Sequence, residues 1–284
     1  MSTAPKAAIL LVGLRSSAGN SDREFAGLLE HLQTAFPTRL CAVGFLESAS
    51  PVIIVSLTEL VRQGAREITV LPGILLATGG IQKAILSLLK RFQTEYPNIK
   101  LSSGEALGVH AKWLRAARER IESCELEFGS GYDRKHTLLL VAAQGTADPE
   151  ANAIISKITR LLWEGMGFGW AETCYSETTL PRVSEGLAQS QRLGFRQVVL
   201  FPCSLFNQNL IGRIHAAAAT YQALNPQVKV VKAPPVGVHP LVLEAFVERV
   251  YEAENGTSNR NCQFCWYREK SVAPVQHHPD HKPA

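Results

Sequence analysis

Residues 62–72 read RQGAREITVLP, and residues 191–202 read QRLGFRQVVLFP. Each stretch contains a glycine, Gly64 or Gly194, followed by an apolar run that ends in proline. Short, continuous apolar runs of this kind, rich in β-branched residues, are typical of strands covered on both faces. The two stretches therefore predict equivalent buried strands in two copies of one unit.

Two further pairs of segments repeat at the same separation of 129 or 130 residues. GFLESASP at 44–51 matches CYSETTLP at 174–181, and ALGVHAKWL at 106–114 matches PVGVHPLVL at 235–243. Several matches at a constant spacing indicate an internal duplication, which decides the architecture.

The segments between the apolar runs have helical periodicity. SDREFAGLLEHLQTAF at 21–36 places its apolar residues on one stripe, and Pro51 and Pro181 stand where the next helices should begin. Strands that alternate with helices predict parallel sheets with right-handed crossovers. We therefore predict an α/β protein with two flavodoxin-like, three-layer domains, each with a four-stranded parallel sheet.

The duplication suggests the domain boundaries. We expect a first domain at 1–124, a linker at 125–135, a second domain at 136–253 and a tail at 254–284, which lacks apolar periodicity. Ligands of parallel sheets bind outside the carboxyl ends of the strands. A functional cleft is therefore expected where the strand ends of the two domains face each other.

Composition excludes several classes of function. The 284 residues are 46% apolar and 19% charged, with a formal net charge of +4, which is too small to favour nucleic acid. No apolar run approaches the roughly 18 to 20 residues that span a membrane. The first residues read as a buried strand and not as a signal peptide. We expect a cytoplasmic protein whose six cysteines are mostly reduced.

Several of these segments together resemble the CbiX-type sirohydrochlorin chelatases, in their long, two-domain form. The segments are FLESASP at 45–51, the third strand at 64–72, GVH at 108–110 and 237–239, and NCQFCWYR at 261–268. The resemblance covers nearly the whole chain. It implies insertion of Co²⁺ or Fe²⁺ into a sirohydrochlorin-like tetrapyrrole, with the metal as a substrate.

The chain departs from that family at its two usual histidines. By resemblance, the first falls at Leu14 and the second at Gly80. The second repeat has Gln144 at the first place, and Asn209 and Leu210 at the second. Imidazole binds Co²⁺ and Fe²⁺ and accepts protons near neutral pH. Its loss predicts a slow or silent chelatase, because a positioned acid or base contributes roughly 10²- to 10⁴-fold in rate.

Other residues are candidates for the site. Glu47 could hold a hydrated cation or accept a pyrrole proton, although it could instead cap the next helix. His215 is the second catalytic candidate, and its alternative is a structural role within a helix. The substrate-binding candidates are Arg15, Ser16, Lys83, Glu177, Asn207, Asn209 and Arg213. The basic ones could pair with the eight carboxylates of sirohydrochlorin or remain solvated surface charges.

His110 and His239 occur in matched GVH segments at the start of the last helix of each repeat. A lone histidine repeated in both halves predicts a structural hydrogen bond at the helix start.

The tail contains a separate candidate metal site. Cys262 and Cys265 form a CxxC pair that could bind Zn²⁺ or a [4Fe–4S] cluster if two more ligands came from the tail or from a second subunit. His277, His278 and His281 could supply them, and a homodimer formed through the tail is one possibility. The alternative is a tail without bound metal.

Two functions follow from the sequence. The first is a divergent chelatase that uses Glu47, the loop at 207–209 and the tail histidines. The second is a catalytically silent protein that binds or carries a tetrapyrrole, a metal or an iron–sulfur cluster.

Overall fold

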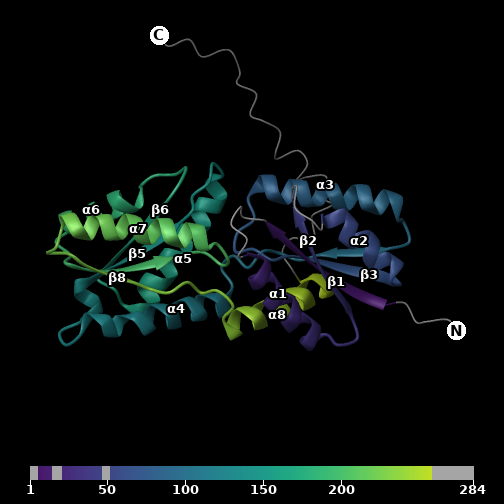
Figure 1. Ribbon diagram of the computed structural model, residues 1–284, viewed down its shortest axis with the longest axis horizontal. Helices are drawn as coiled ribbons and strands as arrows, with labels where there is room; N and C mark the ends of the chain where they lie inside the picture. Colours follow the sequence, from purple (N-terminus) through teal and green to yellow (C-terminus); the bar gives the residue numbers. More distant parts are fainter. Residues whose placement is uncertain (1–5, 15–20, 47–51, 258–284) are drawn as a thin grey trace, which may run out of the picture.

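The fold is an α/β fold with two four-stranded parallel sheets. A computed structural model describes residues 6–14, 21–46 and 52–257. The first sheet has the strand order β2-β1-β3-β4 and the second has the equivalent order β6-β5-β7-β8. The predicted duplication of a parallel, helix-covered sheet is confirmed (Figure 1).

The first repeat contains β1 (Lys6–Leu14), α1 (Ser21–Ala35), β2 (Leu40–Leu46), α2 (Ile53–Arg62), β3 (Ala65–Pro72), α3 (Gly79–Glu95), β4 (Lys100–Ser103) and α4 (Ala111–Glu125). Two short 3₁₀ helices, η1 (Leu126–Phe128) and η2 (Arg134–His136), connect the repeats. The second repeat contains β5 (Thr137–Ala143), α5 (Pro149–Met166), β6 (Trp170–Tyr175), α6 (Val183–Arg192), β7 (Gln197–Pro202), α7 (Gln208–Leu224), β8 (Lys229–Lys232) and α8 (Pro240–Asn255). No described helix is long and apolar enough to cross a membrane.

The last helix of each repeat covers the sheet of the other repeat. Helix α8 contacts β3, β4 and α1, whereas α4 contacts β7, β8 and α5. Figure 1 shows α8 beside α1 and α4 beneath the second sheet. The boundaries at 124 and 136 therefore divide the sequence but not the packing. We call the first sheet with α1, α2, α3 and α8 the first lobe, and the second sheet with α4 to α7 the second lobe.

We call this arrangement of α4 and α8 the helix exchange. Side chains of both helices stabilise it. In the second lobe, fully buried Trp113 of α4 lies 6.3 Å from Phe201 of β7, measured between ring centroids. In the first lobe, Glu254 of α8 accepts hydrogen bonds from Thr69 Oγ1 (2.8 Å) and Arg39 Nη2 (3.0 Å). One apolar core, which includes Trp113, runs through both lobes. The lobes therefore share one apolar core.

The matched histidines cap the exchanged helices, as predicted. His110 Nδ1 accepts from Lys112 N and His239 Nδ1 accepts from Leu241 N, both at 3.2 Å. Each ring also reaches the other exchanged helix. Nε2 of His110 lies 3.2 Å from Glu248 Oε2, and Nε2 of His239 lies 3.3 Å from Glu119 Oε2.

Protonation of His110 should destabilise the fold. Its pKa is lowered, chiefly by burial and next by the charge of Arg249. The unfolded chain therefore binds this proton more tightly, so stability that is full above about pH 6.5 is lost as the pH falls toward the lowered pKa. We expect the drop in Tm between about pH 7.5 and about pH 5.5 to be smaller in His110→Asn, which keeps a capping acceptor. Equal drops in His110→Asn and the wild type would contradict this assignment.

Gly169 lies where two backbone segments meet at the start of β6. Its N–H donates to Arg134 O (2.7 Å), and a Cβ at this position would lie 2.0 Å from Lys135 O. Because backbone must shift to accept it, Gly169→Ala should lower the free energy of unfolding by about 2 to 3 kcal/mol. Gly165→Ala is the matched control: it lies in α5, with no described atom outside its own helix within 4 Å. That change should be neutral or stabilise by about 0.5 to 1 kcal/mol. Similar denaturation midpoints for the two variants would refute the expectation.

Candidate functional site

The carboxyl ends of strands from both sheets border one cleft. Its lining includes Leu14 after β1, Leu46 at the end of β2, 73–76 after β3, 143–146 after β5 and 203–207 after β7. The cavity has a volume of about 480 Å³. Ligand sites of parallel sheets are expected at this position, and pockets of several hundred Å³ accept small organic molecules. The cleft is therefore the candidate functional site.

The two walls of the cleft differ in chemistry. Among the described lining residues, those of the first lobe are apolar apart from Thr78, whereas those of the second lobe combine amide and hydroxyl side chains with apolar ones. The apolar side chains are Leu14, Phe25, Leu46, Ile74, Leu75, Leu76 and Ile81. The polar side chains opposite them are Gln144, Thr146, Asn152, Ser204 and Asn207. A flat ligand with an apolar face and polar substituents would fit between such walls.

The described lining contains one ionisable side chain, the thiol of Cys203. Burial raises the pKa of this thiol far above neutral pH, so Cys203 remains protonated. Leu14 and Ile81 stand at or beside the places where the resemblance puts histidines. The described part of the lining therefore has no group able to accept a proton near neutral pH.

Two of the predicted binding residues, Glu177 and Arg213, form an ion pair beside the cleft. Gln144 joins them, because its Nε2 donates to Glu177 Oε2 (2.8 Å) and its backbone oxygen accepts from Glu177 N (3.0 Å). Since the carboxylate and the guanidinium neutralise each other, neither offers an unpaired charge to a ligand. Sequence reasoning identified Gln144 only as the place of a missing histidine. The ion pair between Glu177 and Arg213 has no signal in the sequence.

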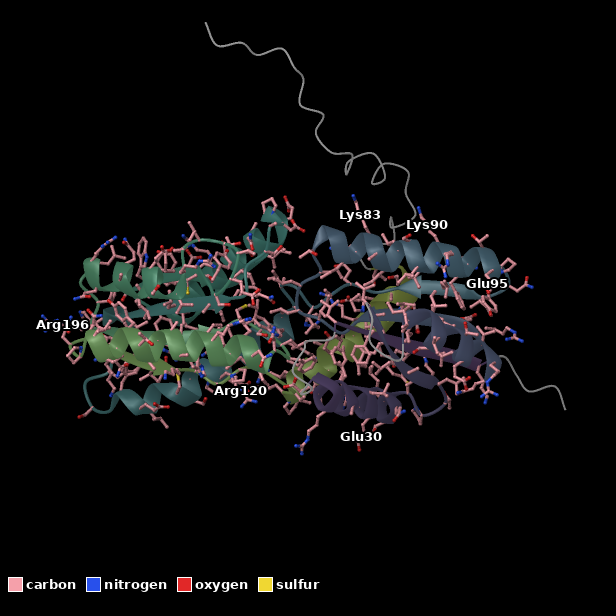
Figure 2. All side chains as sticks on the ribbon, turned by 45° about the horizontal axis from the view of Figure 1, so that its top comes forward. Glu30, Lys83, Lys90, Glu95, Arg120 and Arg196 are labelled. Atoms are coloured by element: carbon pink, nitrogen blue, oxygen red, sulfur yellow. The ribbon has the colours of Figure 1, made fainter. Side chains whose placement is uncertain are left out.

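The other predicted binding residues are spread along two helices. Asn207 caps α7, with its Oδ1 accepting from Leu210 N (3.0 Å), and also lines the cleft. Asn209 is exposed on α7 and is not part of the lining. Lys83 is exposed on α3, also outside the lining, and Figure 2 shows it projecting from this helix on the same side as Lys90. By the spacing of the repeat, Lys83 corresponds to Arg213.

The structure places His215 away from the cleft. It lies on α7, close enough to Lys232 of β8 for that charge to act on it, and it is not part of the cleft lining. Burial first, and then Lys232, lower its pKa. Its buried Nε2 has no hydrogen-bond partner among the described residues. The geometry therefore does not bring His215 together with the other predicted site residues.

The remaining predicted site residues lie outside the described residues and stay predictions. They are Arg15, Ser16, Glu47, Cys262, Cys265, His277, His278 and His281. Leu14 and Leu46, which precede Arg15 and Glu47 in the sequence, both line the cleft. Among the described histidine, cysteine, aspartate and glutamate residues, no group of three is arranged to hold a metal ion.

Sequence reasoning missed Asp148, which lies between the lining residues Thr146 and Asn152 in the sequence. It caps α5 through Oδ1, which accepts from Glu150 N (3.0 Å), and its Oδ2 accepts from Gly79 N of α3 (2.6 Å). Asp-Pro at the start of a helix is a recognisable capping signal. The bond to the other lobe has no such signal.

Comparison with known proteins agrees with this geometry. The family model CbiX matches residues 8–124 and 138–253. The chain belongs to the CbiX family. This family of sirohydrochlorin chelatases inserts cobalt or iron, and the chain is a member of its two-domain long form.

Two curated relatives and one solved structure illustrate the relationship. The chain is 30% identical to a sirohydrochlorin cobaltochelatase of Priestia megaterium, covering 94% of this chain and 85% of that protein. It is 26% identical to a sirohydrochlorin ferrochelatase of Bacillus subtilis (strain 168), covering 87% and 92%. SirB from Bacillus subtilis with Fe³⁺ superposes with a TM-score of 0.76 at 26% identity, covering 89% of this chain and 97% of that one.

Proposed function

We propose that the cleft binds sirohydrochlorin or a similar tetrapyrrole and that this CbiX-family chain inserts Co²⁺ into it. The observation that carries the proposal is the position and asymmetry of the cleft: strand ends from both sheets meet around it, and, apart from Thr78, the amide and hydroxyl side chains of its described lining all come from the second lobe. The apolar wall suits the face of a macrocycle. The polar wall suits its ring of carboxylates, and the rim of a molecule larger than the cavity would extend toward solvent.

Insertion of a divalent metal releases two pyrrole protons, so the reaction needs a proton acceptor. We assign this role to Glu47, which follows the lining residue Leu46 in the sequence. Its counterpart in the second repeat, Glu177, is bonded to the lining residue Gln144, and this correspondence supports the assignment. A carboxylate oxygen can also replace a water ligand of a hydrated Co²⁺ ion.

Cobalt is proposed over iron because the relative at 30% identity is a cobaltochelatase and the two ferrochelatases are at 26%. The test is to incubate the purified full chain with sirohydrochlorin and Co²⁺, or Fe²⁺ without air, and to follow the absorption of the macrocycle. Insertion of Co²⁺ faster than in a protein-free control, and faster than insertion of Fe²⁺, is the expected result. No acceleration by either metal would refute the chelatase.

A second candidate is a protein that binds the tetrapyrrole without turnover. The absence of a proton acceptor from the described lining favours it. Binding of sirohydrochlorin with no acceleration of metal insertion would support this function. The CxxC at Cys262 and Cys265 stays a predicted metal or cluster site that neither the relatives nor the described residues support, and metal analysis of protein purified without air tests it.

A further inference from the structure

One carboxylate of the second lobe holds the start of a helix in the first. Asp148 Oδ2 accepts the N–H of Gly79, the first residue of α3, at 2.6 Å. Its Oδ1 caps α5 through Glu150 N at 3.0 Å. The amino ends of helices carry partial positive charge, and N–H bonds to an ionised carboxylate are among the stronger protein hydrogen bonds. The start of α3 is therefore tied to the start of α5.

This tie lies at the border of the cleft. Thr78 and Ile81, on either side of Gly79, line the cleft, as do Thr146 and Asn152 near Asp148. Other bonds join the lobes away from this edge. Gln208 of α7 donates to Glu24 of α1 at 2.9 Å, and Lys112 of α4 pairs with Glu244 and Glu248 of α8. Separation of the two walls at the α3 edge therefore requires the bond between Asp148 and Gly79 to break.

We propose that Asp148 is a positioning residue that holds the two walls of the cleft at their observed spacing. A tetrapyrrole can then enter only if the bond between Asp148 and Gly79 opens. This statement about entry rests on the proposed function, whereas the positioning role of Asp148 does not. If Asp148 served only to cap α5, any residue with the same capping ability could replace it.

Two variants remove the tie from opposite sides. Asp148→Ser keeps a capping oxygen for α5 but loses the second carboxylate oxygen that Gly79 requires. Gly79→Pro removes the donor, at a helix position that favours proline, and the ψ of 159° at Thr78 suits a residue before proline. Asp133→Ser is the matched control, because Asp133 caps η2 through Lys135 N (2.9 Å) in the segment between the repeats.

Two buried cysteines distinguish opening of the cleft from unfolding. Cys203 lines the cleft and is 4% exposed, whereas Cys174 is fully buried in the core between the second sheet and α6. Alkylation of the full chain by iodoacetamide, with each cysteine followed by peptide mass mapping, reports both sites in one reaction. Opening of the cleft exposes Cys203 alone, and unfolding exposes both.

We expect Asp148→Ser and Gly79→Pro each to raise the alkylation rate of Cys203 by about tenfold and to leave Cys174 unchanged. The double variant should equal the single ones, since both remove the same bond, and Asp133→Ser should match the wild type. An unchanged Cys203 rate, equal increases at Cys203 and Cys174, or multiplied effects in the double variant would overturn the proposal. Sirohydrochlorin should slow Cys203 alkylation in the wild type. If it does not, while the variants still accelerate the reaction, the proposed function fails and the tie stands.

Discussion

The double substitution Leu14→His and Gly80→His is expected to raise the rate of Co²⁺ insertion into sirohydrochlorin by about 10²-fold or more over the wild type. These are the positions where the resemblance places histidines. Leu14 lines the cleft, and Gly80 precedes the lining residue Ile81. A Cβ at Gly80 would meet no described neighbour closer than Thr78 Oγ1, at 3.9 Å. Imidazole supplies a nitrogen ligand for the metal and a proton acceptor near neutral pH, which the described lining lacks.

The matched control is Leu76→His, which also places an imidazole on the apolar wall of the cleft but at a position without a family histidine. Absorption of the macrocycle gives the initial rate for each variant at the same pH. If the control gains as much as the double variant, the effect reflects a general base anywhere in the cleft. If the double variant binds sirohydrochlorin but gains nothing, the cleft differs from that of its relatives in more than two side chains.

Trp113→Ala is expected to lower the free energy of unfolding by about 3 to 5 kcal/mol, and the loss should be felt in the second lobe. Trp113 is fully buried and belongs to α4, which packs against β7 and β8 although it ends the first repeat. Removal of its ring leaves a cavity beside Phe201. Hydrogen exchange should therefore quicken first in β7 and β8, and later in β1 and β3.

Trp170→Ala is the control for the loss of an indole, because Trp170 is 39% exposed on β6. It should cost about 1 kcal/mol or less. Urea denaturation gives the free energies, and exchange followed by mass spectrometry gives the location. If hydrogen exchange in Trp113→Ala were faster only in the first sheet, the packing of α4 against the second sheet would be contradicted.

The sequence was sufficient to predict the duplicated parallel sheets and the capping roles of His110 and His239, because both depend on local patterns that occur twice. The exchange of α4 and α8 could not be predicted in this way. Helical periodicity shows which face of a helix is apolar. It cannot show which of two equivalent sheets that face covers. Only the positions of Trp113 and Glu254 in the folded chain show which sheet each helix covers.

The candidate site was predicted in part for a similar reason. Repeat spacing located Glu177 at a strand end, and Arg213 was expected in or after a cleft loop, but the sequence could not show that they neutralise each other. It placed His215 near the cleft by counting turns of a helix, which does not give the direction of the side chain, and His215 is not part of the described lining. Asp148 escaped notice because its bond to Gly79 joins residues distant in sequence.

The central claim is that a tetrapyrrole lies between the apolar and the polar wall of the cleft. A crystal structure of the full chain grown with saturating sirohydrochlorin tests this claim most directly. We expect the macrocycle to lie between segments 73–76 and 203–207, with one face against the first lobe. A macrocycle bound at any other surface, or an empty cleft at saturation, would contradict this expectation.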